Sequence, residues 1–374
     1  MNNLLFFGTT NYGINLSESD KLKFKELSTK FNISVITYGE KEEFIKHGDV
    51  AIQYFKKPKK LLFQYIYFYL FNYKFVKNFC KDNKIGIISC KDPIAAFIPV
   101  LIKKFSKYEI KLIIEQHGDY LNLLLNQRKF RSNLLIKILS KIISNFTYKN
   151  CDLIRGVEHT YTNSVAKKYN KKFITFPAWV DYSIFTTRDF ERKNLLFVGN
   201  IIPRKGVLFL IRQFHEFCKN SNYKEKLLIV GDEQNPSYAM ECKKYISDND
   251  IKNVEFLGRK DSFELAKLYS SSKLLLMASN FEGLPRVLIE SGLCGIPSLA
   301  TDIQGINEPF GSKGGTLLYE LNNHNDFKNK LKMFLQEDNI QKDLGKKALN
   351  LSVKLAGKNS FVENWEEAVS ILYE

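Results

Sequence analysis

Short apolar runs alternate with longer amphipathic segments along the chain, and this alternation predicts most of its secondary structure. Leu4–Phe7 is an apolar run that ends at Gly8, which indicates a buried strand entering a loop. A helical pattern from about Glu18 to Phe31 leads into a second apolar run at Ile33–Tyr38. The same reasoning predicts a helix at 93–105 and strands at 85–90, 111–115, 152–156 and 173–176.

The second half of the chain repeats this pattern from its own first strand, Leu195–Val198. Strands that alternate with helices form parallel sheets, and two such sets predict an α/β protein of two facing Rossmann-like domains. Ligands of such sheets bind beyond the carboxyl ends of the strands, so we expect a site in the cleft between the domains. The later strands of the second half are predicted at 227–230, 254–257, 274–277 and 298–300.

The predicted domain boundaries follow from a polar linker at 189–194. Residues 1–190 form the N-terminal domain and residues 191–355 the C-terminal domain, each large enough for its own core. Residues 356–374 form a last helix, which contains Trp365 and is expected to pack back towards the N-terminal domain.

The net charge of +16 lies entirely in the first half of the chain. Residues 1–193 carry 33 basic and 17 acidic side chains, whereas residues 194–374 carry 23 of each. Residues 51–150 alone hold 19 basic and 5 acidic side chains. A basic face on one domain implies an anionic partner, either a membrane surface or a nucleic acid.

Two segments of the basic half suggest a membrane surface. Lys56–Lys60 precedes the apolar and aromatic run Leu61–Phe71, and apolar residues recur at helical spacing from Leu134 to Phe146 with Lys137 and Lys141 among the polar positions. Basic amphipathic helices lie on anionic membranes, although a stripe that packs on the sheet gives the same pattern. The run Leu61–Phe71 is too short to span a bilayer, so we expect peripheral association.

The compartment is predicted from the N-terminus and the cysteines. Residues 1–8 lack the charged region and long apolar region of a signal peptide. The six cysteines are scattered, with no Cys-x-x-Cys pair and no cluster of histidines, which is typical of free thiols in a reducing compartment. We therefore expect a cytoplasmic protein at the inner face of the cytoplasmic membrane.

Phe281–Glu290 carries the strongest chemical signal in the chain. Glu282 lies in a turn marked by Gly, Leu and Pro, and Glu290 lies about two turns into the helical pattern that follows Pro285. The free N–H groups at the start of this helix, together with its dipole, favour an anion. A phosphate cradle with a carboxylate on either side suits a nucleotide-sugar, but an ordinary loop and helix with a solvated Glu290 has the same spacing.

Other predicted strands also end in residues suited to phosphate. Gly199 is followed by Arg204-Lys205-Gly206 at the entry to a helix, and two adjacent cations at a helix start make a site for a diphosphate. Gly231-Asp232 and Gly258-Arg259-Lys260 follow the next two strands. Gly13, after the first strand, lets a backbone amide approach a phosphate or marks a plain turn.

In order and spacing these residues resemble the GT4 family of retaining glycosyltransferases (group 1 glycosyl transferases), which have the GT-B fold of two facing Rossmann-like domains. The resemblance covers nearly the whole second half. Its motifs are Phe197-Val-Gly199, Arg204-Lys205-Gly206-Val207, Leu228-Ile-Val-Gly231, Val254-Glu-Phe-Leu-Gly258, Leu268-Tyr269, Phe281-Glu-Gly-Leu-Pro285, Glu290, Cys294-Gly-Ile-Pro297, Ala300-Thr301, Gly305 and Glu308. In the first half the resemblance is looser and rests on Gly13, His117 and the segment 177–185.

The resemblance implies a role for each matched residue. Arg204 and Lys205 would bind the donor diphosphate and stabilise it as it leaves, and Glu282 would hold hydroxyls of the donor sugar. Glu290 would accept hydrogen bonds from the ribose, and His117 would approach the sugar from the opposite domain. The catalytic set is thus Glu282, His117, Arg204 and Lys205. The other donor contacts are expected at Gly13, Gly199, Arg259, Gly283, Leu284, Arg286 and Val287.

The implied reaction moves a hexose-type sugar from a UDP- or GDP-linked donor to a glycan or lipid-linked acceptor in cell-envelope polysaccharide or glycoconjugate synthesis. Similarity implies retention of configuration by same-face attack, without a metal or a further cofactor. An Asp-x-Asp pair at Asp248-Asn249-Asp250 has the spacing of a metal pair in the other glycosyltransferase fold. It falls in a polar turn between a helix and a strand, so we interpret it as a solvated loop.

The chain departs from the family on the acceptor side. Ala178-Trp179 replaces the usual Asn-Gly before Val-Asp, Val157-Glu158 stands where Ser-Glu is common, and the loop after the first strand lacks a run of glycines. Two alternatives share the donor chemistry, namely a nucleotide-sugar 2-epimerase and a non-catalytic protein that binds a nucleotide-sugar or glycan. A nucleic-acid binder would also be basic and aromatic, but no recognition motif supports it.

Overall fold

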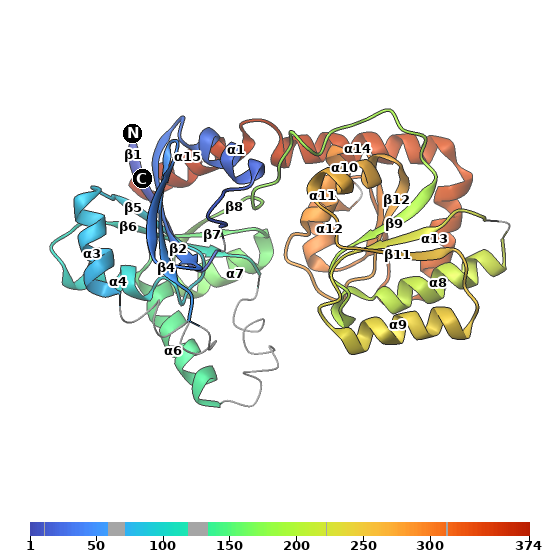
Figure 1. Cartoon of the computed structure of the whole chain (residues 1–374), viewed down its shortest axis with the longest axis horizontal. Helices are drawn as coiled ribbons and strands as arrows, with labels where there is room; N and C mark the ends of the chain where they lie inside the picture. Colours follow the sequence, from blue (N-terminus) through green and yellow to red (C-terminus); the bar gives the residue numbers. More distant parts are fainter. Residues whose placement is uncertain (11, 59–71, 119–133, 222, 312) are drawn as a thin grey trace. The chain divides into compact units, whose positions relative to one another are not determined.

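The computed structural model describes residues 1–10, 12–58, 72–118, 134–221, 223–311 and 313–374, and the chain divides into two compact units (Figure 1). Unit 1 comprises Met1–Trp179 and Phe361–Glu374, and unit 2 comprises Val180–Ser360. The predicted boundary after residue 190 lies eleven residues beyond the one between the units.

Unit 1 contains an eight-stranded sheet in the order β3-β4-β2-β1-β5-β6-β7-β8. All neighbouring strands are parallel except β3 and β4, which form an antiparallel hairpin at one edge. The strands are β1 (Asn2–Phe7), β2 (Phe31–Gly39), β3 (Glu43–His47), β4 (Val50–Lys56), β5 (Ile87–Cys90), β6 (Lys111–Gln116), β7 (Leu153–Gly156) and β8 (Lys172–Thr175).

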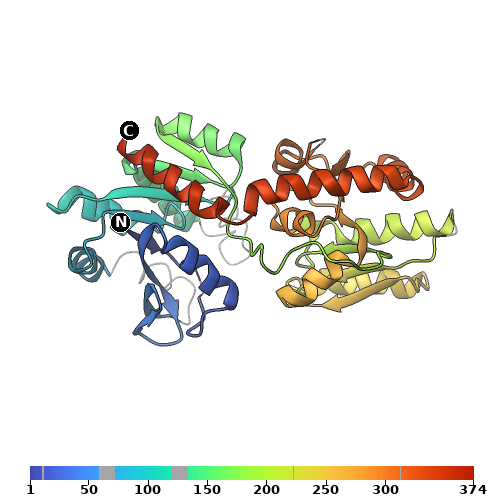
Figure 2. The ribbon, with the colours of Figure 1, turned by 90° about the horizontal axis from the view of Figure 1, so that it is seen from above.

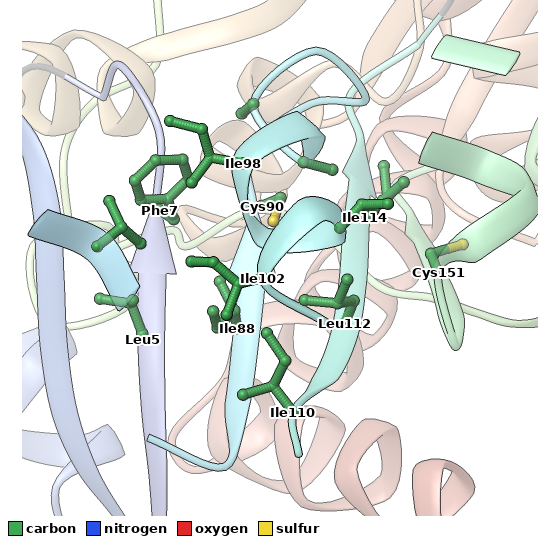
Figure 3. Close-up of a cluster of buried hydrophobic side chains, with 14 of the residues drawn as sticks. Leu5, Phe7, Ile88, Cys90, Ile98, Ile102, Ile110, Leu112, Ile114 and Cys151 are labelled. Atoms are coloured by element: carbon green, nitrogen blue, oxygen red, sulfur yellow. The ribbon is translucent and has the colours of Figure 1, made fainter. Parts of the chain in front are cut away.

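Helices cover both faces of this sheet (Figures 1 and 2). The helices of unit 1 are α1 (Glu18–Leu27), α3 (Tyr73–Asp82), α4 (Phe97–Phe105), α6 (Leu134–Asn150), α7 (His159–Tyr169) and α15 (Ser360–Tyr373). On one face, apolar residues of β1, β5 and β6 pack against α3, α4 and α6, as Figure 3 shows for Ile88, Ile98 and Ile114. On the other face α1 and α15 bury Phe24 and Trp365 against the sheet.

Unit 2 contains a six-stranded, fully parallel sheet in the order β11-β10-β9-β12-β13-β14. Its strands are β9 (Asn194–Val198), β10 (Leu227–Val230), β11 (Val254–Gly258), β12 (Ser272–Met277), β13 (Ser298–Thr301) and β14 (Thr316–Tyr319). Its helices are α8 (Val207–Lys219), α9 (Pro236–Asp248), α10 (Ser262–Ser270), α11 (Arg286–Leu293), α12 (Gln304–Phe310), α13 (His324–Gln336) and α14 (Asp338–Ala356). A central parallel strand is buried on both faces, which explains the continuous apolar run of β9, where Leu195 and Leu196 lie in different cores.

These elements confirm the predicted α/β class with two parallel sheets and every strand predicted in the described parts of the chain. The helix predicted from residue 93 begins only at Phe97, because residues 93–96 form a turn in which the amide of Ala95 donates to the Asp92 side chain. Strands β3, β4 and β14 were not predicted. The segment Leu61–Phe71 lies outside the described residues.

Two further sequence predictions concern the compartment and the membrane. All six cysteines lie in described segments and are free thiols. Of the helices in the described residues, none is long and apolar enough to cross a bilayer.

Candidate functional site

The loop after β12 and the start of α11 form the centre of the candidate site in unit 2. Helix α11 begins at Arg286 after Pro285, whose side chain provides no hydrogen-bonding cap. The first amides of a helix have no partner within it, and the helix dipole adds positive potential there. The predicted cradle Phe281–Glu290 therefore has the local structure that favours an anion.

Glu282 of this loop contacts the two predicted cations. Its carboxylate accepts a hydrogen bond from Lys205 Nζ at 2.5 Å and lies 3.4 Å from Arg204 Nη1. Arg204 also donates to the backbone oxygen of Phe281, and the amide of Asn280 donates to the backbone oxygen of Arg204 at 2.9 Å. The two segments, far apart in sequence, are thus joined by side-chain and backbone contacts.

The approach of these two segments requires a glycine at position 206. Gly206 ends the short 3-10 turn Pro203–Lys205 with a φ of +63°, a left-handed conformation that other residues seldom adopt. A Cβ at this position would collide with the backbone oxygen of Ala278. The glycine of the Arg204-Lys205-Gly206 motif therefore allows the cations to lie against the loop that carries Glu282.

Glu290 is the second carboxylate of the motif and is almost completely buried. The hydroxyl of Tyr269 donates to its Oε2 at 3.1 Å, and Arg286 Nη2 lies 3.2 Å from its Oε1. Burial raises the pKa of Glu290, and the charge of Arg286 only partly offsets this effect. The alternative of a solvated Glu290 is therefore wrong.

Three glycines bring the ends of neighbouring strands together at the same edge of the sheet. Gly199 donates its amide to Val230 at 2.9 Å, and Gly231 donates to Gly258 at 3.0 Å. A Cβ at Gly231 would collide with the backbone oxygen of Gly199. Arg259 next to Gly258 is 80% exposed and lies 3.7 Å from Asp232. The strand ends predicted to carry the site are therefore adjacent in unit 2.

Gly13 and His117 lie in unit 1, where each follows a strand of the parallel sheet. The backbone oxygen of Gly13 accepts a hydrogen bond from Tyr54 at 3.0 Å. His117 follows β6, its side chain is 42% exposed, and its Nε2 lies 3.3 Å from Glu115 Oε2. The contacts with a ligand that the sequence predicts for these two residues stay predictions.

Sequence reasoning missed a group of polar residues beside His117. Glu115 accepts hydrogen bonds from Ser89 at 2.8 Å and from Arg155 at 3.1 Å. Burial disfavours ionisation of Glu115, but the hydrogen bond to His117 and the charge of Arg155 outweigh it and lower its pKa to about 2. Arg155 interrupts the apolar strand β7, and a charge inside a buried strand is the signal that could have revealed this group.

The Asp248-Asn249-Asp250 segment begins at the last residue of α9 and continues into the turn after it. Asp250 forms an ion pair with Lys252, and the side chains of both residues are largely exposed. Among the residues that the structure describes, no group of three or more His, Cys, Asp or Glu is arranged to hold a metal ion.

The second unit also matches a known protein family. Residues 185–351 match the family model of the Glycosyl transferases group 1. The matched segment contains Arg204, Lys205, Glu282 and Glu290, so the residues assembled at the ends of the second sheet all lie within it.

Two curated relatives extend the similarity beyond unit 2. An uncharacterized glycosyltransferase of Methanocaldococcus jannaschii is 26% identical over 336 residues, which are 90% of this chain and 86% of that protein. The second is the GalNAc-alpha-(1->4)-GalNAc-alpha-(1->3)-diNAcBac-PP-undecaprenol alpha-1,4-N-acetyl-D-galactosaminyltransferase of Campylobacter jejuni. It is 27% identical over 211 residues, which are 54% of this chain and 56% of that protein.

Solved structures share the fold over the whole chain. Sucrose-phosphate synthase from Thermosynechococcus elongatus has a TM-score of 0.77 at 14% identity and covers 100% of this chain and 99% of its own. The Anabaena protein HepE, in complex with UDP and glucose, has a TM-score of 0.72 at 12% identity. The match covers 99% of this chain and 100% of HepE. The fold is therefore that of the GT-B glycosyltransferases, and the relatives and the family model support a glycosyltransferase.

Proposed function

We propose that this glycosyltransferase retains configuration, needs no metal or further cofactor, and is of the GT4 type. It transfers a hexose-type sugar from a UDP- or GDP-linked donor to a glycan or lipid-linked acceptor of the cell envelope. The observation that carries the proposal is the contact of Lys205 and Arg204 with Glu282 beside the start of α11. The UDP in the HepE complex and the undecaprenol-linked substrate of the Campylobacter relative support the donor and acceptor classes.

The arrangement around Glu282 suits a donor whose charge lies next to a sugar. The cationic side chains of Lys205 and Arg204 are already positioned by Glu282. Little reorganisation is therefore needed when a diphosphate binds. The Glu282 carboxylate can only accept hydrogen bonds, which fits the hydroxyls of a sugar. A diphosphate on the cations and a sugar on the carboxylate would be adjacent parts of one ligand.

The remaining donor contacts come from groups near these three side chains. We assign the phosphate oxygens to the amides near Arg286 and Val287, and the sugar to the amides of Gly283 and Leu284. Glu290 accepts from the ribose hydroxyls, and the backbone around Arg259 lies near the base. Gly199 and Gly13 allow close approach of backbone to the donor.

The proposed reaction is a displacement on one face of the donor sugar. The bond between the anomeric carbon and the diphosphate oxygen breaks while the acceptor oxygen bonds to the same carbon. The acceptor proton passes to an oxygen of the departing phosphate. Lys205 and Arg204 stabilise the negative charge that develops on the leaving group, and His117 contacts the donor sugar.

The acceptor side is proposed to use α6 as a contact with an anionic membrane. Ile138, Leu139 and Ile142 of this helix are 47%, 48% and 59% exposed. The residues that α6 buries include Ser144 and Thr147, so part of its apolar stripe is exposed while hydroxyl side chains are buried. A helix with exposed apolar residues and lysines between them fits a lipid interface.

The experiment that tests the proposal compares Lys205→Ala and Glu282→Ala with the unaltered protein. A thermal-shift screen of UDP- and GDP-sugars first identifies the donor, because a ligand that binds only the native state raises its stability. Each variant is expected to lose at least about 100-fold in transfer, as when a charge-stabilising donor is removed from an active site. The control is Lys273→Ala, which removes a half-buried Lys–Glu pair with Glu225 elsewhere in unit 2.

Undiminished transfer by both variants would contradict the proposal. The same assay separates the alternatives that share the donor chemistry. Conversion of the donor at carbon 2 in the absence of an acceptor would indicate an epimerase. Binding without turnover over a full panel of donors and acceptors would indicate a binding protein.

A further inference from the structure

Two opposite charges, a buried arginine and a largely buried glutamate, lie next to each other in the sheet of unit 1. Glu115 in β6 and Arg155 in β7 are register partners on adjacent parallel strands. The Arg155 side chain is 1% exposed, and its Nη1 lies 3.1 Å from Glu115 Oε2. Because a buried charge is costly without partners, the other contacts of the pair reveal what it is built to hold.

Arg155 is fixed by three further contacts. Its Nη2 donates to the backbone oxygens of Phe176 at 2.8 Å and Pro177 at 2.6 Å, and its guanidinium lies 4.1 Å from the centre of the Phe176 ring. A planar guanidinium that donates to several fixed acceptors has little freedom to turn. Arg155 therefore presents one N–H group to Glu115 in a fixed direction.

Glu115 is held from two strands and has one further contact. Ser89 of β5 donates to its Oε1 at 2.8 Å, and Arg155 of β7 bonds its Oε2. That same Oε2 lies 3.3 Å from Nε2 of His117, which is the exposed end of the group. The two buried partners thus orient a carboxylate that also contacts His117.

This contact determines which nitrogen of His117 carries the proton. The pKa of Glu115 is lowered to about 2, despite burial, by the hydrogen bond to His117 and the charge of Arg155, so Glu115 is ionised at neutral pH. An ionised carboxylate only accepts hydrogen bonds, so a neutral His117 bonded to it has its proton on Nε2. The other nitrogen, Nδ1, then has a lone pair.

We propose that Glu115, oriented by Arg155 and Ser89, is a positioning residue that holds His117 as the Nε2–H tautomer and leaves Nδ1 to accept a hydrogen bond from a sugar hydroxyl. The identity of the hydroxyl-bearing ligand rests on the proposed function. The tautomer rests on the contacts and the ionisation of Glu115 within unit 1. Stability alone would not require the Glu115–Arg155 pair, because apolar residues of similar size in its place are often as stabilising as a buried ion pair. The contact of Glu115 with His117 gives the pair a further role.

The first test measures the tautomer without any substrate. Nitrogen-15 NMR of the imidazoles in the full chain distinguishes the two tautomers, and the His117→Asn variant identifies the His117 signals among the five histidines. We expect the neutral imidazole of His117 in the unaltered protein to be a single Nε2–H tautomer. In Glu115→Gln the amide can accept or donate, so we expect a mixture of both tautomers. A mixture in the unaltered protein, or no change in Glu115→Gln, would overturn the proposal.

A second variant separates loss of the Glu115 carboxylate from misfolding caused by an unpaired Arg155. Glu115→Gln leaves the buried Arg155 without its counter-charge, whereas Glu115→Gln with Arg155→Met removes both charges together. The double variant is expected to fold and to show the same mixture of tautomers. The control is Asp152→Asn, which breaks a half-buried ion pair with Lys103 in the same unit and is expected to leave the His117 signals unchanged.

Kinetics of sugar transfer complete the test. We expect kcat to fall by about 10- to 100-fold in the double variant, with a smaller change in KM for the donor. Removal of the carboxylate partner of a metal-bound histidine has an effect of this size. Transfer at the unaltered rate despite mixed tautomers would overturn the role in catalysis. A single tautomer in a protein that transfers no sugar would refute the proposed function and support the positioning of His117.

Discussion

The two units share one architecture but place their polar residues differently. In unit 2 the charged residues Lys205 and Glu282 lie on loops beyond the strands, whereas in unit 1 Glu115 and Arg155 lie within the strands themselves. Lys205 and Glu282 pair beyond the strand ends, the edge at which parallel sheets bind ligands, and their side chains are 14% and 9% exposed. Glu115 and Arg155 pair within the sheet itself. In the proposed function unit 2 binds the donor through its charges, and in our further proposal the paired charges of unit 1 orient His117.

The two units also complete their cores differently. The strands and helices of unit 2 come from one continuous segment, Val180–Ser360. Unit 1 includes the last fourteen residues of the chain, and Trp365 of α15 packs against Phe6 and Phe176 with ring centres 5.1 and 5.5 Å apart. The stability of unit 1 therefore depends on a segment that is added after unit 2 in the sequence.

The largest effect is expected from Trp365→Ala, which tests whether the two cores are independent. The side chain is 1% exposed, so its removal should lower the free energy of unfolding of unit 1 by about 3–5 kcal/mol. Hydrogen exchange followed by mass spectrometry reports both units in one experiment. Tyr373→Ala on the same helix is the control, since that side chain is 60% exposed and a surface substitution changes stability by about 0.5 kcal/mol or less. Equal loss of protection in unit 2 would contradict the division.

An intermediate effect on stability is expected from Glu290→Gln. This variant tests whether the buried carboxylate of Glu290 destabilises unit 2 while it contributes to binding of the donor. Burial raises the pKa of Glu290 in the folded protein above the ordinary value of 4.5. The protonated side chain therefore contributes its full stability below pH 4.5, and this contribution is lost as the pH rises through the pKa of the folded state. Glutamine does not ionise, so the variant should gain stability relative to the unaltered protein between acidic and neutral pH. Urea denaturation across this range measures the gain.

The same variant should bind the donor more weakly. Loss of a charged hydrogen-bond acceptor costs about 1.5–3 kcal/mol, or roughly 10- to 100-fold in affinity, which calorimetry can measure. Unchanged affinity would exclude Glu290 from the site, and a parallel pH dependence in both proteins would show that burial of this carboxylate carries no cost.

The smallest effect is expected for substitutions in α6. They compare the exposed apolar side chains of unit 1 with those of unit 2 as contacts for a membrane. Leu139→Ser with Ile142→Ser removes two exposed apolar side chains, each worth about 1 kcal/mol if half buried in lipid. Binding to vesicles with anionic lipid should weaken accordingly and should also fall with salt. Met240→Ser, which alters an apolar side chain of unit 2 that is 69% exposed, is the control. Equal loss in the control, or no loss in the α6 variant, would remove α6 from the proposed membrane surface.

Central strands that are buried on both faces, such as β9, could be predicted from the sequence, whereas the strand β3 at the edge of the sheet could not. The central strands are apolar on both faces, so short runs such as Leu195–Val198 were visible in the sequence. Strand β3 alternates exposed and half-buried residues at an edge of the sheet, so Glu43–His47 lacks the apolar run from which other strands were predicted. Gly48, with a φ of +57° between β3 and β4, was the one local signal of that hairpin.

The sequence by itself determined the cradle of unit 2, because its parts are neighbours in the chain. Glu282, Pro285 and Glu290 lie within one turn and the helix that follows it, so their arrangement depends on local backbone geometry. The tertiary structure alone decided that Glu290 is buried against Tyr269, and that Lys205 pairs with Glu282 across 77 positions of sequence.

The same physical reason applies to the group around His117. Ser89, Glu115 and Arg155 come from three successive strands of the sheet, and Glu115 and Arg155 are 40 positions apart in sequence. Strand order and register bring them together, and neither is encoded in a short motif. A charged residue in an apolar strand is visible in the sequence, but its partner is defined only when the sheet has formed.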